Sequence, residues 1–362
     1  MTSRTLAAAL AATLLLAGAP GASAEPLYTL SFLPAGFQGA QLNDAGQIVG
    51  SAGGGAAIYS GGVVIDVAAP PSIGQGINNQ GDITGSLNPI ASSQAFTYIG
   101  GTFTNIHPSV SGEYPESEGV AINDQGVVGG NVRFMAGESN NGFIYRNGAV
   151  EYIGTLGGDY SPLAALNNQG VAAGYAAFAG PAGGTFHAYT YANGALQDLG
   201  TLGGANSAAT DINDLGQVAG WSTITGSGLF PFLYSGGGMI NLGTLGGSEA
   251  AANALNDDGF VVGYSFLAGG GSATHAFLYA DGTLLDLNTL VDIEGGWQLT
   301  TAQDINDAGQ ILGTACRNGS CSSVLLSPVP EPATSLMLLA GLGALLPLAR
   351  RSRRLLPSRP VG

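Results

Sequence analysis

A five-residue pattern recurs along this chain of 362 residues: an aliphatic residue, Asn, Asn or Asp, any residue, and Gly. The seven copies span 42–46, 77–81, 122–126, 166–170, 212–216, 255–259 and 305–309, and a second Gly follows four residues after each. Asn or Asp before a Gly of positive φ is typical of a tight turn. Short runs such as Gln217–Gly220 leave these turns and predict strands. Each copy therefore predicts a β-hairpin.

The spacing between copies is typical of a propeller blade. Successive Asn positions lie 35 to 50 residues apart. This range includes the length of a four-stranded propeller blade, which is about 40–45 residues. A third strand ends in Tyr in six units, as in His275–Tyr279, and a second turn such as Asn193-Gly194 follows it. A fourth strand comes next, as in Leu196–Leu202. Each unit thus predicts four antiparallel strands.

The last unit lacks a fourth strand, because its third strand, Ser323–Leu326, is followed by Pro328. Leu27–Leu33 has the Leu-x-x-Leu-x-x-Leu spacing of the fourth strand at Leu196–Leu202 and precedes the first unit. We therefore expect an all-β, seven-bladed β-propeller of four-stranded repeats over residues 25–328, with the N-terminal strand closing the last blade. An open solenoid is the alternative, but it would need capping repeats and would gain nothing from a split unit.

Several units resemble the bacterial extracellular HAF repeat family. The residues that carry this resemblance are His275–Tyr279, His187-Ala188-Tyr189 and the Gly-Thr-Leu-Gly-Gly runs at 154–158, 200–204 and 243–247. The first two units match only loosely. The resemblance implies export and a repeat architecture, and it implies no particular activity.

Residues 1–24 are typical of a secretory signal peptide. Arg4 precedes an apolar run, Leu6–Ala17, and Ala22-Ser23-Ala24 stands before Glu25. The run is too short to span a membrane comfortably. We therefore predict cleavage between Ala24 and Glu25.

The C-terminal end has three parts in a fixed order. Pro330-Glu331-Pro332 is followed by an uncharged segment, 333–349, and then by four Arg residues within 350–354. Seventeen apolar residues are just enough for a transmembrane helix, and the Arg cluster should remain cytoplasmic. We assign 329–354 to this signal and 355–362 to a short tail.

This order closely resembles the PEP-CTERM sorting signal of Gram-negative bacteria. The resemblance implies recognition by an exosortase-type membrane protease, processing near Pro330, Glu331 and Pro332, and transient anchoring by 333–349. It also implies delivery to the cell surface or the extracellular matrix, in company with exopolysaccharide. A plain C-terminal anchor is the alternative, in which the Arg-rich tail would be retained.

Composition and charge narrow the function classes. Gly occupies 61 positions, charged residues make up 9% of the chain, and Lys is absent. Between Glu25 and Pro330 there are 23 acidic residues and three Arg, a formal charge of −20. Such a body repels phosphate backbones, so nucleic acid is excluded as a partner.

Cys316 and Cys321 flank Arg317-Asn318-Gly319-Ser320, and Asn-Gly is a strong hairpin signal. Counting outward from the turn places the two sulfurs on adjacent strands, so we predict a disulfide. A metal site is the alternative, but no further ligand lies near in sequence.

No motif points to catalysis or to a cofactor. The three His residues, at 107, 187 and 275, lie outside any metalloprotease motif, and neither a nucleophile elbow nor a Walker loop is present. His187 and His275 share one repeat position, which favours a structural hydrogen bond. The segment from Asp304 partly resembles a calcium loop, yet Ala315 stands where a bidentate Glu is needed. We therefore name no catalytic, cofactor or metal residue.

The longer connections between second and third strands are expected on one face of the propeller, within 131–141, 176–184, 222–229 and 265–273. Variation on a fixed scaffold is where a binding surface would form. The sequence favours a non-enzymatic propeller that binds a surface polysaccharide or another envelope protein, or that acts structurally. A secreted hydrolase or lyase acting on polysaccharide is the alternative.

Overall fold

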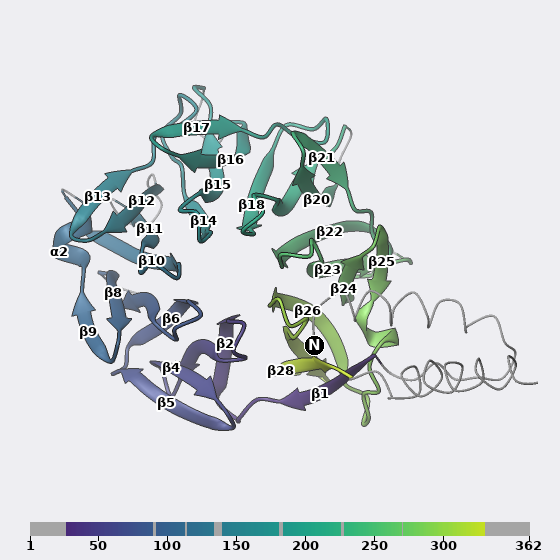
Figure 1. Cartoon of the computed structure of the whole chain (residues 1–362). Helices are drawn as coiled ribbons and strands as arrows, with labels where there is room; N and C mark the ends of the chain where they lie inside the picture. The colour runs from purple at the N-terminus through teal and green to yellow at the C-terminus, as the bar shows by residue number, and fades with distance from the viewer. Residues whose placement is uncertain are drawn as a thin grey trace, which may run out of the picture.

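The computed structural model describes residues 27–329 apart from 90–91, 113, 134–139, 181–183, 226–227 and 270. Seven four-stranded antiparallel sheets surround a central axis (Figure 1). In six of them the strands follow in chain order from the axis to the rim. The predicted seven-bladed β-propeller is thus confirmed.

The strands of blades 1 to 4 have the following bounds. Blade 1 holds β2 (Phe37–Leu42), β3 (Ile48–Ala52), β4 (Gly55–Ser60) and β5 (Val63–Ala68); blade 2 holds β6 (Ser72–Ile77), β7 (Ile83–Leu87), β8 (Gln94–Ile99) and β9 (Thr102–Asn105); blade 3 holds β10 (Glu116–Ile122), β11 (Val128–Arg133), β12 (Asn140–Arg146) and β13 (Ala149–Tyr152); blade 4 holds β14 (Leu163–Leu166), β15 (Ala172–Ala177), β16 (Phe186–Ala192) and β17 (Ala195–Asp198).

The remaining blades follow the same plan. Blade 5 holds β18 (Ser207–Ile212), β19 (Val218–Thr223), β20 (Leu229–Ser235) and β21 (Gly238–Asn241); blade 6 holds β22 (Gly246–Leu255), β23 (Val261–Leu267), β24 (Thr274–Ala280) and β25 (Thr283–Asp286); blade 7 holds β26 (Gln298–Ile305), β27 (Ile311–Arg317), β28 (Ser320–Pro328) and β1 (Tyr28–Phe32). Two short helical turns, α2 (His107–Val110) and η1 (Leu287–Thr289), lie between strands.

Each repeat requires glycine at two positions, for a different structural reason at each. The first has φ between 70° and 81° in all seven copies, which an L side chain rarely adopts. The second lies on the second strand, where a Cβ would meet a carbonyl oxygen of the first strand, as at Gly220 against Ala208. In blades 2 to 6 it also pairs with a buried aromatic residue of the third strand, as Gly220 pairs with Phe232. That ring packs over the space that a side chain would fill.

A ring of asparagines joins the blades at the axis. The Asn of each repeat is buried, and its Nδ2 donates to the main-chain oxygen of the Asn in the next blade at 2.8–3.2 Å. The bond from Asn306 to Asn43 closes the ring between blades 7 and 1. The Oδ1 of Asn43 also accepts the N–H of Gln47, four residues on, and the same bond is present in all seven copies. One side chain therefore fixes its own turn and the neighbouring blade.

The N-terminal strand completes the last blade as predicted. Strand β1 pairs with β28 in antiparallel register, from Tyr28 opposite Pro328 to Phe32 opposite Val324. Tyr28 is 1% exposed and lies in the largest apolar cluster, between blades 6 and 7. The N–H of Val329 donates to the oxygen of Leu27 at 2.8 Å, so the two ends of the propeller lie side by side.

The expected flanking segments lie outside the described residues. These are the signal peptide 1–24, with its cleavage site at Ala24 and Glu25, the membrane segment 333–349 and the tail that follows it. Within the part of the chain that the structure describes, no helix has the length and apolar character needed to cross a membrane.

Replacing Asn123 by Ala tests the asparagine ring. The substitution removes the bond to the oxygen of Asn167 and the acceptor for the N–H groups of Gln125 and Val127. Because the buried N–H of Val127 and the buried oxygen of Asn167 lose their partner, we expect the free energy of unfolding to fall by about 2–4 kcal/mol in chemical denaturation. Q125A, an exposed neighbour, is the matched control. An N123A protein as stable as Q125A would contradict the role of the ring.

Tyr28 offers a test of the closing strand. Its hydroxyl is buried without a hydrogen-bond partner among the described residues, and burial raises the pKa of this group, so it remains a neutral phenol. Y28F removes the unpaired hydroxyl and keeps the ring, so we expect the free energy of unfolding to rise by about 1 kcal/mol. Y28A should lower it by about 3–5 kcal/mol through the cavity it leaves. A loss of stability in Y28F would mean that the hydroxyl has a favourable contact.

Candidate functional site

The seven Asn-containing turns meet at the axis on one face of the propeller, which we call the axial face. Together they line a hollow of about 160 Å³. A second ring of hydrogen bonds runs around its mouth. The residue after each Asn uses its Oδ1 to accept the N–H of the corresponding residue in the preceding blade, at 2.8–3.0 Å. Five of these residues are Asp and two are Asn; in blade order they are Asp44, Asn79, Asp124, Asn168, Asp214, Asp257 and Asp307.

The two asparagines divide this second ring into unlike arcs. Asn79 donates its amide to Asp44 and Asp124, and Asn168 donates to Asp124 and Asp214. No amide separates Asp214, Asp257, Asp307 and Asp44. Burial, and then the neighbouring carboxylates, raise the pKa of Asp257 and raise that of Asp307 to about 6. Repulsion is therefore concentrated on the arc that closes the propeller.

Two further carboxylates line the hollow from the first strands. Asp304 accepts the N–H of Leu42 at 2.7 Å, across the seam between blades 7 and 1, and Asp211 accepts the N–H of Leu255 at 2.9 Å. Burial raises the pKa of Asp211 to about 6, and burial and the charge of Asp211 raise the pKa of Asp304 well above its usual range. Both groups are thus committed to bonds between blades.

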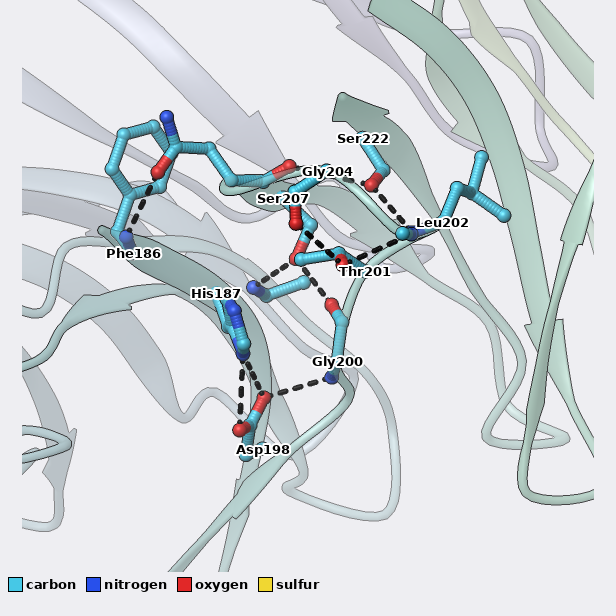
Figure 2. Close-up of polar contacts among 12 residues, drawn as sticks. Phe186, His187, Asp198, Gly200, Thr201, Leu202, Gly204, Ser207 and Ser222 are labelled. Atoms are coloured by element: carbon cyan, nitrogen blue, oxygen red, sulfur yellow. Dashed lines mark hydrogen bonds and ion pairs between the residues drawn. The ribbon is translucent and has the colours of Figure 1, made fainter. Parts of the chain in front are cut away.

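The three histidines are each held by a neighbouring side chain. Nδ1 of His187 lies 2.9 Å from Oδ1 of Asp198, and Nδ1 of His275 lies 2.7 Å from Oδ2 of Asp286 (Figure 2 shows the first pair). Nδ1 of His107 lies 2.8 Å from Oγ of Ser117, a buried residue. His187 and His275 each join the third strand of a blade to an Asp at the end of the fourth strand, and that Asp also accepts an N–H of the link that follows. The repeat position that these two histidines share therefore has a structural use.

The Gly-Thr-Leu-Gly-Gly runs are links between blades. In Figure 2, Thr201 Oγ1 donates to the oxygen of Gly204, and the N–H of Leu202 donates to Oγ of Ser222 in blade 5. Ser207 Oγ donates to the oxygen of Gly200 and accepts the N–H of Ala188. The Thr and its hydrogen bond recur at Thr155 and Thr244. These hydroxyls are therefore parts of the scaffold.

Cys316 and Cys321 form a disulfide across the hairpin between β27 and β28, where they are directly paired with Cα atoms 4.1 Å apart. Pro330, Glu331 and Pro332 lie outside the described residues. The segment from Asp304 to Gly309 forms one of the seven axial turns. Among the residues described, no three His, Cys, Asp or Glu side chains are grouped to hold a metal ion.

The opposite face of the propeller, which we call the loop face, carries the connections between second and third strands, and these vary between blades as the sequence indicated. Aromatic side chains on this face were not anticipated. The residue after the second Gly is Tyr175, Trp221 and Tyr264 in blades 4 to 6, all partly exposed. The other four blades have polar residues there: Ser51, Ser86, Asn131 and Thr314. This difference at one repeat position was the available signal.

Replacing Asp307 by Asn tests the arc of the second ring that contains only Asp. D307N keeps the Oδ1 acceptor, as Asn79 and Asn168 do, and removes a charge between Asp257 and Asp44. Because burial raises the folded-state pKa of Asp307 to about 6, the stability that this group contributes is fully present below about pH 4 and is lost as pH rises through about 6. We expect D307N to raise the free energy of unfolding at pH 7 and to weaken its decline between pH 4 and 7.

D124N is the matched variant, because Asp124 accepts amide bonds from both Asn79 and Asn168. We expect D124N to lower stability at pH 7. Thermal unfolding across this pH range checks both variants, and an equal effect of the two would contradict unequal arcs.

Comparison with known proteins identifies one segment of the chain. Residues 328–354 match the PEP-CTERM protein-sorting motif. This motif implies exosortase-dependent export to the cell envelope or surface in Gram-negative bacteria. No curated protein matches the chain.

Solved structures resemble the propeller at low identity. YCF48 bound to a D1 peptide is 12% identical, with a TM-score of 0.50, and the match covers 85% of this chain and 96% of that one. TolB from Acinetobacter baumannii is 14% identical, with a TM-score of 0.44 and coverage of 87% and 82%. XC5397, a gluconolactonase from Xanthomonas campestris, is 12% identical, with a TM-score of 0.39 and coverage of 84% and 88%. The likeness to YCF48 shows a shared fold and nothing further.

Proposed function

We propose that this chain is an exported, non-enzymatic propeller of the cell surface or extracellular matrix, which binds an extracellular polymer through its loop face. The role is linked to exopolysaccharide, and an exosortase-type protease processes the chain near Pro330, Glu331 and Pro332. The sorting motif at 328–354 supports the destination. We further propose that the repeats are of the HAF type, which agrees with an extracellular location.

One observation carries the non-enzymatic assignment: the three histidines and Ser207, which could do acid–base or nucleophilic chemistry, are hydrogen-bonded into the scaffold. His187 and His275 are paired with Asp198 and Asp286 beside the links. Ser207 is fully buried and joins blade 4 to blade 5. Such groups hold the ring together, whereas the differences between blades lie on the loop face.

A polysaccharide hydrolase or lyase is the second candidate, because Asp211 and Asp304 are buried carboxylates that line one hollow. Paired carboxyl groups can act as general acid and base. However, the hollow holds about 160 Å³, and small-molecule sites take roughly 300–1,000 Å³. Both carboxylates also accept main-chain N–H groups of the next blade. These contacts favour a structural role.

The proposal predicts binding without turnover. The full chain, purified in detergent, should retain extracellular polysaccharide from its own source and release no shorter or unsaturated products. D211N should leave that binding unchanged, because Asp211 lines the axial hollow on the opposite face. Affinity electrophoresis measures binding, and reducing-end and unsaturated-product assays measure turnover. Product release that D211N abolishes would establish the enzyme instead, and neither binding nor release would leave a structural spacer.

A further inference from the structure

Four aromatic side chains on the loop face form a continuous cluster across blades 4 and 5, which we call the aromatic platform: Tyr160, Tyr175, Phe186 and Trp221. Ring centroids lie 6.1 Å apart for Tyr160 and Tyr175, 5.1 Å for Tyr175 and Phe186, and 5.9 Å for Phe186 and Trp221. All four side chains are partly exposed. The platform thus presents a band of aromatic rings that crosses from one blade to the next.

The platform lies at the loop end of its strands. The oxygen of Tyr160 accepts the N–H of Ala177, the last residue of β15, and Phe186 is the first residue of β16. The N–H of Phe186 donates to Oδ1 of Asn206 in the link to blade 5 (Figure 2). The rings are therefore held by main-chain contacts on both blades.

The polar atoms of the platform are unused by the fold. Among the described residues, neither the hydroxyls of Tyr160 and Tyr175 nor Nε1 of Trp221 has a hydrogen-bond partner, and none of these atoms is among the fully buried unpaired ones. By contrast, the hydroxyls of Tyr152 and Tyr191 bond to Val110 and Glu151. Burial raises the pKa of Tyr160 and Tyr175, so both remain neutral donors and acceptors.

The charge around the platform restricts its ligand. No Lys or Arg occurs between Arg146 and Arg317, a stretch that contains all of blades 4 to 6. Asp159 lies beside Tyr160 and acts on its hydroxyl. An anionic polymer would therefore find no Lys or Arg to pair with here, and the carboxylate of Asp159 would repel it. A ligand must instead offer apolar faces to the rings and hydroxyl groups to the free donors, and it must lack negative charge.

We infer that the aromatic platform binds an uncharged polysaccharide chain, whose sugar rings pack on Tyr175, Phe186 and Trp221 while its hydroxyls bond to the free polar atoms. A pyranose ring combines an apolar C–H face with peripheral hydroxyls, which matches this surface. Aromatic side chains supply such amphipathic contact at low entropic cost. This inference rests on the proposed function and specifies the ligand class of its loop face.

Tryptophan fluorescence tests the platform directly, because Trp221 and Trp297 are the two tryptophans of the chain. In the W297F full chain, titration with an uncharged α-glucan, β-glucan, mannan or galactomannan should give a saturable shift for at least one of them. Alginate, an anionic chain, should give none. In the matched W221F chain, where Trp297 emits, the shift should be absent.

Substitutions separate this inference from the proposal on which it rests. Y160S and Y175F should each weaken the binding of the uncharged polysaccharide by about tenfold, the scale of one aromatic contact or free hydroxyl. F103S, an exposed aromatic of blade 2, should leave affinity unchanged. Unfolding curves verify that each variant folds.

Three results overturn the inference. They are no shift with any uncharged polysaccharide, equal binding by Y160S, Y175F and F103S, or a shift with a peptide digest alone. If Y160S, Y175F and F103S bind equally and the full chain still retains its native polysaccharide, the platform assignment fails and the proposed function stands. If products are released, the proposed function fails whether or not the platform binds.

Discussion

The asparagine of each axial turn is the interaction on which the rest of the structure depends. Its Oδ1 accepts an N–H of the turn that joins the first two strands. Its Nδ2 donates to a main-chain oxygen of the next blade at 2.8–3.2 Å. The chain joins blades 7 and 1 only through β1, whose place in blade 7 depends on its hydrogen bonds to β28. The contact between Asn306 and Asn43 therefore does the same work at this seam as between blades that are adjacent in sequence. Each unpaired buried amide would cost about 1–3 kcal/mol, which explains why Asn stands at this position in all seven repeats.

Closure also determines where the ends of the propeller lie. Because β1 pairs with β28, Leu27 and Val329 are hydrogen-bonded neighbours at the edge of blade 7. The sorting motif matches from residue 328, so it begins where the last strand ends. The sorting motif and ring closure therefore meet at one edge, which is distant in the fold from the strands of blades 4 and 5 (Figure 1). The binding surface that we propose on blades 4 and 5 is thus separate from the edge at which the sorting motif begins.

Much of this architecture could be predicted from the sequence, because its determinants are local. The turn pattern, the Tyr at the end of the third strand and the Leu spacing of Leu27–Leu33 each repeat within one unit. The unequal arcs of the second ring could not, since Asp44 and Asp307 are 263 residues apart and the turn pattern accepts Asn or Asp equally. The platform was missed for a related reason. Tyr175 and Trp221 read as ordinary strand residues until the fold brings Phe186 between them.

The scaffold assigns different freedom to its two faces. On the axial face, every turn contacts two neighbours, so a change in one blade disturbs the bonds of the next, and only Asn and Asp can exchange. On the loop face, the residue after the second Gly has no such partner in most blades, and it varies from Ser51 to Trp221 without breaking the ring. New binding chemistry can therefore arise blade by blade on this face. The grouping of Tyr175, Trp221 and Tyr264 on three consecutive blades is what such a division would produce, because a polymeric ligand needs contacts that extend along the ring.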